Sequence, residues 1–440
     1  MKRIIKALKA NKDVDQWRIV HRKATGYQLY VIGSMVDNIR KIVTDKYFVT
    51  IYCRNDGGMG YTHFSVFAHD MPDMEKRLEP AVFTAKRTQN PFFELPMPGY
   101  SPAVETFDPT LTGNIEDILF VQLADRLIDA VEHEPYVRLS SSEYFLDVQD
   151  IHLCNSRGVN LNWNQTEIFF DGVLLSGNTG EEVEIHFEPR ARRLQDLPIR
   201  EIIREQAEFA RDARHAVLPP SGKIPVVLSG EALTHIFAPL VHHTSGNTQY
   251  NRTSRFKPGQ PIYQKDEPEG DLLTMISNGF IPFGLRTAPV DGDGVAAGRY
   301  ELIREGIFRK PWCTQQYADY LGVDATGEIA NLEIPIGSHS RKSLLEDDGP
   351  VVQVEAFSAL MPDVVSGSFA AEIKVGYLYE NGEKTPIRGG AVSGNLIDGF
   401  NRAHFSTEAR QGQYGLSLTR FGTYRGPQSI RFEGFQVTGE

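Results

Sequence analysis

The chain has 440 residues, a formal net charge of −11 and 41% hydrophobic residues. This length exceeds one ordinary hydrophobic core, so we expect two domains. The net negative charge argues against a nucleic-acid partner, because binding to the phosphate backbone depends on clustered Lys and Arg. No stretch approaches the ~20 consecutive apolar residues of a membrane helix, so we expect no membrane partner either.

The N-terminal segment and the cysteines indicate the cellular compartment. Lys9 and Lys12 interrupt the first apolar residues before a signal-peptide core can form. Cys53, Cys154 and Cys313 are odd in number and lack C-x-x-C spacing, which predicts neither a disulfide framework nor a thiolate zinc site. We therefore expect a cytoplasmic protein with small, buried thiols.

The first half of the chain is expected to mix helices and strands. Asn55-Asp56-Gly57-Gly58 predicts a hairpin turn, because Gly tolerates positive φ. Asn114 and Asp196 are expected to cap the helices that follow them. Short strands are predicted at 27–32, 39–43, 47–53, 61–67 and from 143 to 187, with helices at 72–87, 115–132 and 197–215 and a Pro-rich segment at 91–102.

The second half is expected to be mostly β. Leu218-Pro219-Pro220-Ser221-Gly222 cannot continue a helix and predicts a domain boundary. A strand at 224–228, a helix at 230–241 and short strands near 300–308, 351–357, 371–379, 385–393 and 428–437 follow it, with a hairpin at 380–383. The sequence thus predicts an α+β protein of two domains, a mixed N-terminal domain over 1–217 and a β-rich C-terminal domain over 218–440.

An ordered set of short motifs resembles the PmbA/TldD family, whose members are described as modulators of DNA gyrase and as metallopeptidases. No one motif is specific, but their order along nearly the whole chain is, and 366–397 is the strongest part. The set comprises Asn155-Ser156-Arg157-Gly158, Val226-Val227-Leu228 before a helix, Asp291-Gly292-Asp293-Gly294, Arg304-Glu305-Gly306, Asn331-Leu332, Ser366-Gly367-Ser368-Phe369, Glu380-Asn381-Gly382 with Pro386, and Ser393-Gly394-Asn395-Leu396-Ile397.

The resemblance implies one of two kinds of member. TldD-like members carry a His-Glu-x-x-x-His zinc motif on the helix after the Val-Val-Leu strand and a Cys near the C-terminus, and TldE/PmbA-like members lack these ligands. Aligned on 226–228, the two family His positions fall at Ala238 and His243, and the family Glu falls at Pro239. Ala cannot bind zinc, Pro cannot act as a general base, and the last cysteine is Cys313. The resemblance therefore implies a TldE/PmbA-like member, with zinc expected only in a TldD-like partner.

Other candidate sites are weaker. His235 and His242 would lie ~10 Å apart along an unbroken helix, and the adjacent His242 and His243 would point in different directions, so one zinc ion does not suit them. A helix C-terminus is an ordinary place for His. The acid pairs Asp291/Asp293 and Asp347-Asp348 are expected in solvated turns. The chain contains no Gly-x-Ser-x-Gly, Walker A or Rossmann glycine pattern.

The resemblance implies a non-catalytic subunit of a TldD-type metallopeptidase assembly that degrades small or unfolded peptides. Its partners would be a zinc-bearing TldD-like subunit or a second copy of itself, together with an extended peptide that pairs with strand edges of the β-rich half. One alternative is a metallopeptidase active by itself through a rearranged site of His235, His242, His243 or His339. Another is a homodimeric peptide-binding regulatory protein. Nothing in the sequence is typical of DNA recognition, despite the gyrase-linked family name.

Overall fold

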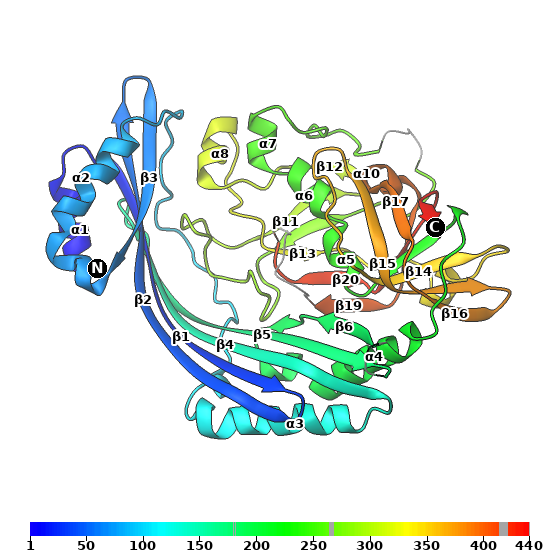
Figure 1. The fold of residues 1–440 in the computed structure, drawn as a ribbon. Helices are drawn as coiled ribbons and strands as arrows, with labels where there is room; N and C mark the ends of the chain where they lie inside the picture. Colours follow the sequence, from blue (N-terminus) through cyan, green and yellow to red (C-terminus); the bar gives the residue numbers. More distant parts are fainter. Residues whose placement is uncertain (179, 181, 264–267, 413–420, 440) are drawn as a thin grey trace.

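In the computed structural model, a long curved sheet from the first half of the chain curves around a β-rich second half, which lies on its concave side (Figure 1). The structure describes residues 1–440 except 179, 181, 264–267, 413–420 and 440. The curved sheet has the strand order β3-β2-β1-β4-β5-β6, with β7 paired to β5, and its strands pair antiparallel. The strands are β1 (Gln16–Ile32), β2 (Met35–Asn55), β3 (Gly58–Phe67), β4 (Val137–Asn155), β5 (Asn160–Ser176), β6 (Val183–Phe187) and β7 (Arg190–Ala191).

The strands of this sheet are much longer than the sequence suggested. The separate strands expected at 39–43 and 47–53 form one strand, β2, and the expectation of a break was wrong. Thr44, Asp45 and Lys46, which lie between the two expected strands, pair with β1. They lie on the exposed part of the strand, where polar side chains face solvent while the backbone ladder continues. The hairpin predicted at 55–58 is confirmed between β2 and β3.

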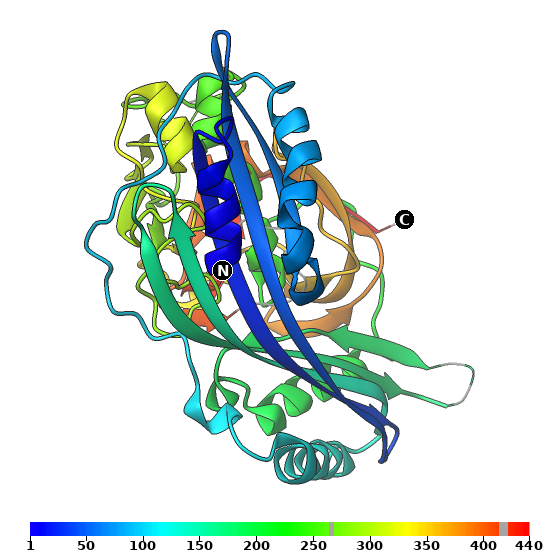
Figure 2. The ribbon, with the colours of Figure 1, turned by 90° about the vertical axis from the view of Figure 1, so that its left-hand side faces the viewer.

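Side-chain alternation separates the two faces of the sheet. Trp17, Ile19, Leu29 and Val31 of β1 are buried on the convex face. Helices α1 (Lys2–Ala10) and α2 (Met74–Ala85) cover one end of this face, and α3 (Phe120–Glu132) and α4 (Ile199–Ala213) cover the other, as Figures 1 and 2 show. Because alternate residues point to opposite faces, Arg18, Val20 and Arg22 face the second half of the chain.

The helices predicted in the first half of the chain are present, but their ends differ from the predicted ends. Asn114 caps as expected, since its side chain accepts a hydrogen bond from Asp117 N, although the first turn, Ile115–Leu119, is a π-helix. Asp196 does not cap α4, contrary to expectation. It ends a short 3₁₀ turn and pairs with Arg193, and α4 begins only after Pro198. No helix in the described part of the chain is long and apolar enough to cross a membrane.

Within the described ranges, the second half forms two sheets around a large apolar core. The first has the order β12-β11-β10-β13-β20-β19, and the second the order β18-β21-β9-β14-β15-β17-β22-β8, with β16 paired to β15. The strands are β8 (Gly222–Lys223), β9 (Val226–Ser229), β10 (Met275–Asn278), β11 (Arg299–Arg304), β12 (Ile307–Phe308), β13 (Asn331–Glu333), β14 (Val351–Phe357), β15 (Ser368–Glu380), β16 (Glu383–Ile387), β17 (Ala391–Asn395), β18 (Ala403–Phe405), β19 (Ala409–Gly412), β20 (Tyr424–Pro427), β21 (Ser429–Phe432) and β22 (Gln436–Thr438).

Short helices accompany these sheets: α5 (Ala232–His235), α6 (Ala238–His243), α7 (Gly246–Tyr250), α8 (Gln315–Leu321), α9 (Arg341–Leu344) and α10 (Leu396–Gly399). The single helix expected over 230–241 was wrong, because the chain breaks between α5 and α6. Pro239 has no N–H to donate to the carbonyl of His235, and it lies instead in the first turn of α6, where a proline is well tolerated. The hairpin predicted at 380–383 is confirmed by the pairing of β15 with β16.

Gly60 provides a test of how tightly α2 is seated on the sheet. A Cβ at Gly60 would overlap the carbonyl oxygens of Ala85 and Thr88 at the C-terminal end of α2. We predict that Gly60→Ala lowers the free energy of unfolding by about 1–3 kcal/mol, because backbone atoms cannot yield as a flexible side chain would. Urea unfolding measures this change. The control is Gly349→Ala, where a Cβ meets open space; equal effects of the two variants would contradict the prediction.

Candidate functional site

Ala238, Pro239 and His243, the residues aligned above with the family zinc motif, lie on α6. His243 is fully buried there, and both ring nitrogens bond to backbone groups. Its Nε2 lies 2.9 Å from the carbonyl oxygen of Val365, and its Nδ1 accepts a hydrogen bond from Arg255 N at 3.2 Å. Burial is the main cause that lowers the pKa of His243, and the neighbouring His242 and Arg255 act in the same direction. A neutral imidazole with Nε2 protonated satisfies both contacts.

The residues at this position do not fit a zinc ion. Ala238 and Pro239 offer no ligand atom, and the two nitrogens of His243 already bond to the protein. His235 ends α5 and His242 belongs to α6, so these residues do not share one helix. Within the described ranges, the clusters of three metal-ligating side chains are Asp271/His339/His404 and Asp171/His186/Glu188, and neither contains His235, His242 or His243.

The cysteines lie in the core, as predicted. Cys53, Cys154 and Cys313 are buried free thiols. Burial raises the pKa of Cys53 and Cys154 to about 11 and that of Cys313 to about 12. Such thiols stay protonated at neutral pH and are poor nucleophiles and poor metal ligands.

The Asp-Gly-Asp-Gly motif lies in a loop of the second half that contacts the curved sheet. Residues 289–297, called the 289–297 loop below, form a small hairpin in which Val290 pairs with Ala296. Asp291 organises it from within: its Oδ1 accepts from the backbone N of Asp293, Gly294 and Val295 at 2.9, 3.0 and 2.9 Å. Its Oδ2 accepts from Glu328 N at 3.2 Å. One carboxyl group therefore fixes both the loop and a neighbouring segment.

The expectation that Asp291 and Asp293 lie in a solvated turn was wrong. Burial and the neighbouring Asp293 raise the pKa of Asp291 to about 7, and the backbone N–H groups offset only part of this rise. The turn packs against the curved sheet, so both carboxyl groups are half-buried, and only Gly292 at its tip is exposed. Asp347 does meet the expectation, because it lies in an exposed turn, where it pairs with Arg431.

The 289–297 loop docks onto the concave face of the sheet through charge and apolar packing. Arg18 forms an ion pair with Asp293 and donates from Nη1 to Gly292 O at 2.8 Å. Val290 packs against Leu153 of β4 and Val159. Gly294, at φ +102°, permits this close approach, because a Cβ there would crowd Val159. The loop thus ties the N-terminal sheet to the second half.

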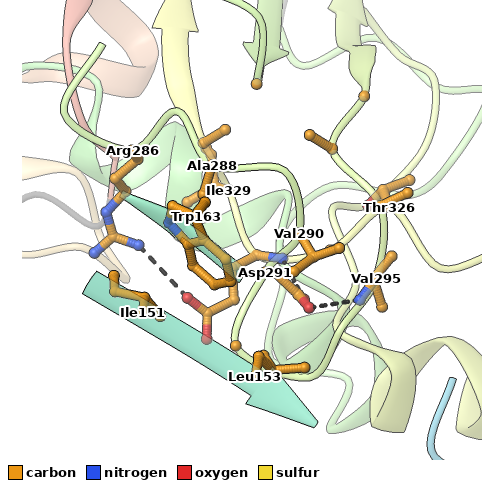
Figure 3. Close-up of a pocket in the computed structure, with 18 of the residues that line it drawn as sticks. Ile151, Leu153, Trp163, Arg286, Ala288, Val290, Asp291, Val295, Thr326 and Ile329 are labelled. Atoms are coloured by element: carbon orange, nitrogen blue, oxygen red, sulfur yellow. Dashed lines mark hydrogen bonds and ion pairs between the residues drawn. The ribbon is translucent and has the colours of Figure 1, made fainter. Parts of the chain in front are cut away.

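Two cavities adjoin this loop and share Val290, Val295 and Ala296 as lining residues. The first has a volume of about 290 Å³ and is shown in Figure 3, where Ile151 and Leu153 of β4 lie opposite the loop. Trp163 of β5 completes the sheet side, and Arg286 and Glu328, 3.7 Å apart, supply charge. Apolar walls with a few polar groups are typical of ligand sites.

The indole N–H of Trp163 gives the first cavity an available donor. Trp163 Nε1 is buried, and no described residue accepts a hydrogen bond from it. A buried donor without a partner is costly, so a ligand acceptor in the cavity would be stabilised by this group. Trp163 was not predicted as a site residue, because a Trp on an alternating strand is an ordinary core residue.

The second cavity, of about 500 Å³, lies between the Pro-rich segment and the turn after β4. Asn155, the first residue of the 155–158 motif, bonds to both of these segments. Its Nδ2 donates to Pro96 O at 2.9 Å, and its Oδ1 accepts from the backbone N of Arg157 and Val159. Arg157 also pairs with Glu94. The motif therefore holds the Pro-rich segment in place as a cavity wall.

The pKa of Asp291 predicts a specific pH dependence of stability. Between its ordinary pKa of 3.8 and the folded value of about 7, the folded chain keeps a proton that the unfolded chain has released. The contribution of this group to the free energy of unfolding therefore falls as pH rises through that window. We predict that Asp291→Asn removes this decline, measured by urea unfolding at a series of pH values.

A second carboxyl provides a control of opposite sign. The backbone N–H groups of Ser366 and Val365 hold the pKa of Asp363 below its ordinary value. Asp363→Asn should therefore lose stability relative to wild type at neutral pH, and this difference should shrink as the pH becomes acidic. Parallel pH profiles for wild type and Asp291→Asn would contradict the assignment of the raised pKa to Asp291.

The ion pair that docks the loop is tested by a double-mutant cycle. Arg18→Ala and Asp293→Ala should each lower the free energy of unfolding by about 2–4 kcal/mol, because each leaves a largely buried charge without its partner. Their coupling energy should be about 1–3 kcal/mol. The control cycle uses the exposed pair Arg54 and Asp15, for which we expect less than about 1 kcal/mol. Additive effects of the Arg18 and Asp293 substitutions would show that the pair does not act as a unit.

The chain is similar to several known proteins. Residues 221–439 match a family model described as the PmbA/TldA metallopeptidase C-terminal domain. An uncharacterised protein of Methanocaldococcus jannaschii is 25% identical over 57% of this chain and 60% of its own length. Metalloprotease PmbA of Escherichia coli O157:H7 is 24% identical over 56% of this chain and 54% of its own length. The chain thus matches little more than half the length of these two relatives.

The fold is shared along the whole chain with a solved relative. The structure of TldE from Thermococcus kodakarensis has a TM-score of 0.82 with this chain at 18% identity, and the match covers 100% of both chains. The likeness includes the curved sheet as well as the β-rich half. The matched family model and the relatives named above show that this chain belongs to the PmbA/TldD family, as the order of its motifs predicted.

Proposed function

We propose that this chain is a non-catalytic, TldE/PmbA-like subunit of a TldD-type metallopeptidase assembly that degrades small or unfolded peptides. The observation that carries the proposal is the geometry of α6. Ala238 and Pro239 supply neither a ligand nor a base, and His243 bonds to Val365 and Arg255 inside the core. A chain without these groups cannot activate a zinc-bound water at this position.

The catalytic zinc in this proposal belongs to a TldD-like partner, where it would polarise the scissile carbonyl and activate water. The likeness of fold to TldE supports the non-catalytic assignment, and the three buried free thiols suit the cytoplasmic location that we propose for the complex. A second copy of the chain is the alternative partner.

The contribution of this chain to the assembly would be peptide binding in the cavities beside the 289–297 loop. Apolar side chains such as Ile151 offer contact area, and Trp163 Nε1 offers a donor for a peptide carbonyl. Arg286 and Glu328 offer charges to substrate termini or polar side chains. An unfolded peptide suits these features, because its backbone acceptors are free, whereas a folded protein has already satisfied them.

Peptide hydrolysis by defined mixtures tests the proposal. We expect no hydrolysis of an unstructured peptide by this chain alone, and faster hydrolysis by its mixture with the zinc-bearing TldD-like protein of the same organism than by that protein alone. Trp163→Ala should lower kcat/KM of the mixture about tenfold, equivalent to ~1.4 kcal/mol. Phe83→Ala, an exposed aromatic on α2, is the matched control. Hydrolysis by this chain alone, or no gain on mixing, would reject the proposal.

A further inference from the structure

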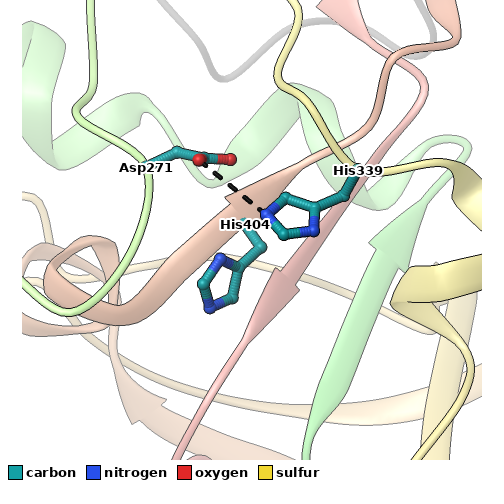
Figure 4. Close-up of side chains that lie close together, drawn as sticks. All are labelled: Asp271, His339 and His404. Carbon is teal, nitrogen blue, oxygen red and sulfur yellow. Dashed lines mark ion pairs between the residues drawn. The ribbon is translucent and has the colours of Figure 1, made fainter.

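A cluster of two histidines and one aspartate (Figure 4) includes His404 of β18 and none of the residues at the motif position on α6. His404 belongs to this edge strand, and its neighbours Ala403 and Phe405 are buried in the core. Because side chains alternate along a strand, His404 points to the opposite, outer side. Asp271 and His339 come from segments distant in sequence and meet it there.

Backbone contacts to β18 fix the other two residues. Asp271 N donates to Ala403 O at 2.8 Å, and Asp271 Oδ2 accepts from Phe405 N at 2.8 Å. His339 pairs with Ser406 in a short parallel bridge, and its carbonyl oxygen accepts from Thr407 N at 2.7 Å. Asp271 Oδ1 therefore stays directed at the histidines, held by the bond that its other oxygen makes.

The distances suit a shared ion better than direct hydrogen bonds. One ligand atom of each residue lies within 4.8 Å of the other two. His339 Nε2 and Asp271 Oδ1 are 4.0 Å apart, which is too long for a hydrogen bond. Zinc holds such ligands at ~2.0–2.2 Å, so two ligands on one ion lie ~3–4 Å apart, within reach of small side-chain rotations.

His404 has a ring nitrogen that makes no hydrogen bond to the described part of the chain, which also favours a shared ion. Its Nδ1 is buried, and no described residue bonds to it. A ring nitrogen that makes no hydrogen bond to the protein is available as a metal ligand. Arg431, the nearby cation, is neutralised by ion pairs with Asp347 and Glu433.

We propose that Asp271, His339 and His404 form a binding site for one divalent transition-metal ion of the Zn²⁺ type. Two imidazoles and one carboxylate are a donor set for such ions, whereas Ca²⁺ and Mg²⁺ require oxygen ligands. Three protein ligands leave one tetrahedral position for water or for an acceptor group of a bound molecule. The site is independent of the motif position at Ala238, Pro239 and His243.

The other cluster, Asp171/His186/Glu188, is a weaker candidate and serves as the control. His186 Nε2 already bonds to Asp171 Oδ2 at 3.0 Å, so its ligand atom is engaged. The ammonium group of Lys374 donates to His186 O and places a positive charge beside the cluster. Two carboxylates with one engaged histidine do not offer the ready donor set of the first cluster.

Calorimetric titration of the chelator-stripped full chain with Zn²⁺ alone tests the site. We expect one strong site per chain in wild type and in His186→Ala, and at least tenfold weaker binding in His404→Ala and in His339→Ala. His339 is half-exposed on a loop, so its variant tests the site even if His404→Ala folds poorly. Zn²⁺ should raise Tm in wild type and His186→Ala but not in the two site variants.

Stoichiometric binding that survives both His404→Ala and His339→Ala, or wild-type binding no stronger than that of the two variants, would overturn the proposal. Peptide hydrolysis plays no part in these readouts, so their failure would leave the proposed function untouched. Zinc binding that is lost in His339→Ala belongs to this cluster, so it would not indicate a zinc site on α6.

Discussion

The ion pair between Arg18 and Asp293 is the contact on which the arrangement of the two halves depends. It joins β1 of the curved sheet to the 289–297 loop of the second half, in a region where both charges have lost most of their water. Such charges are unfavourable unless they are paired, which makes the docked position of the loop specific as well as stable. Apolar contacts of Val290 with Leu153 and Val159 also stabilise the docked position of the loop. The two cavities lie beside this loop, so their shape follows from it.

The strongest sequence motif of the chain, 366–397, has a structural counterpart beside α6. Asp363 binds the backbone N of Val365 and Ser366, and Asn395 Nδ2 donates to Ser366 O, which fixes the turn that presents Val365 O to His243. In this chain, a position that provides a zinc ligand in TldD-like members instead links a helix to this turn. His243 therefore links α6 to this turn and to the backbone of Arg255 through its two ring nitrogens.

In the described part of the chain, both clusters of metal-ligating side chains lie outside the positions aligned with the family zinc motif. Asp271, His339 and His404 are brought together by backbone contacts to β18, an edge strand whose outer side is not covered by another strand of its sheet. A ligand set placed on an edge in this way does not disturb the apolar core beneath it. The proposed metal site and the proposed role in peptide degradation are thus physically separate features of one chain.

The sequence by itself determined the local features of this protein. Turn residues placed the hairpins at 55–58 and 380–383, helical spacing placed helices α2 and α3, and Asn114 marked a helix start, because each depends on neighbouring residues alone. The family and the α+β class followed from the order of these features. Tertiary structure alone decided that β2 is continuous, since its polar middle is held by pairing with β1. It also decided that Asp291 is enclosed and that Asp271 meets His339 and His404. These outcomes depend on which surfaces pack together, and residues far apart in the sequence carry no local signal of that packing.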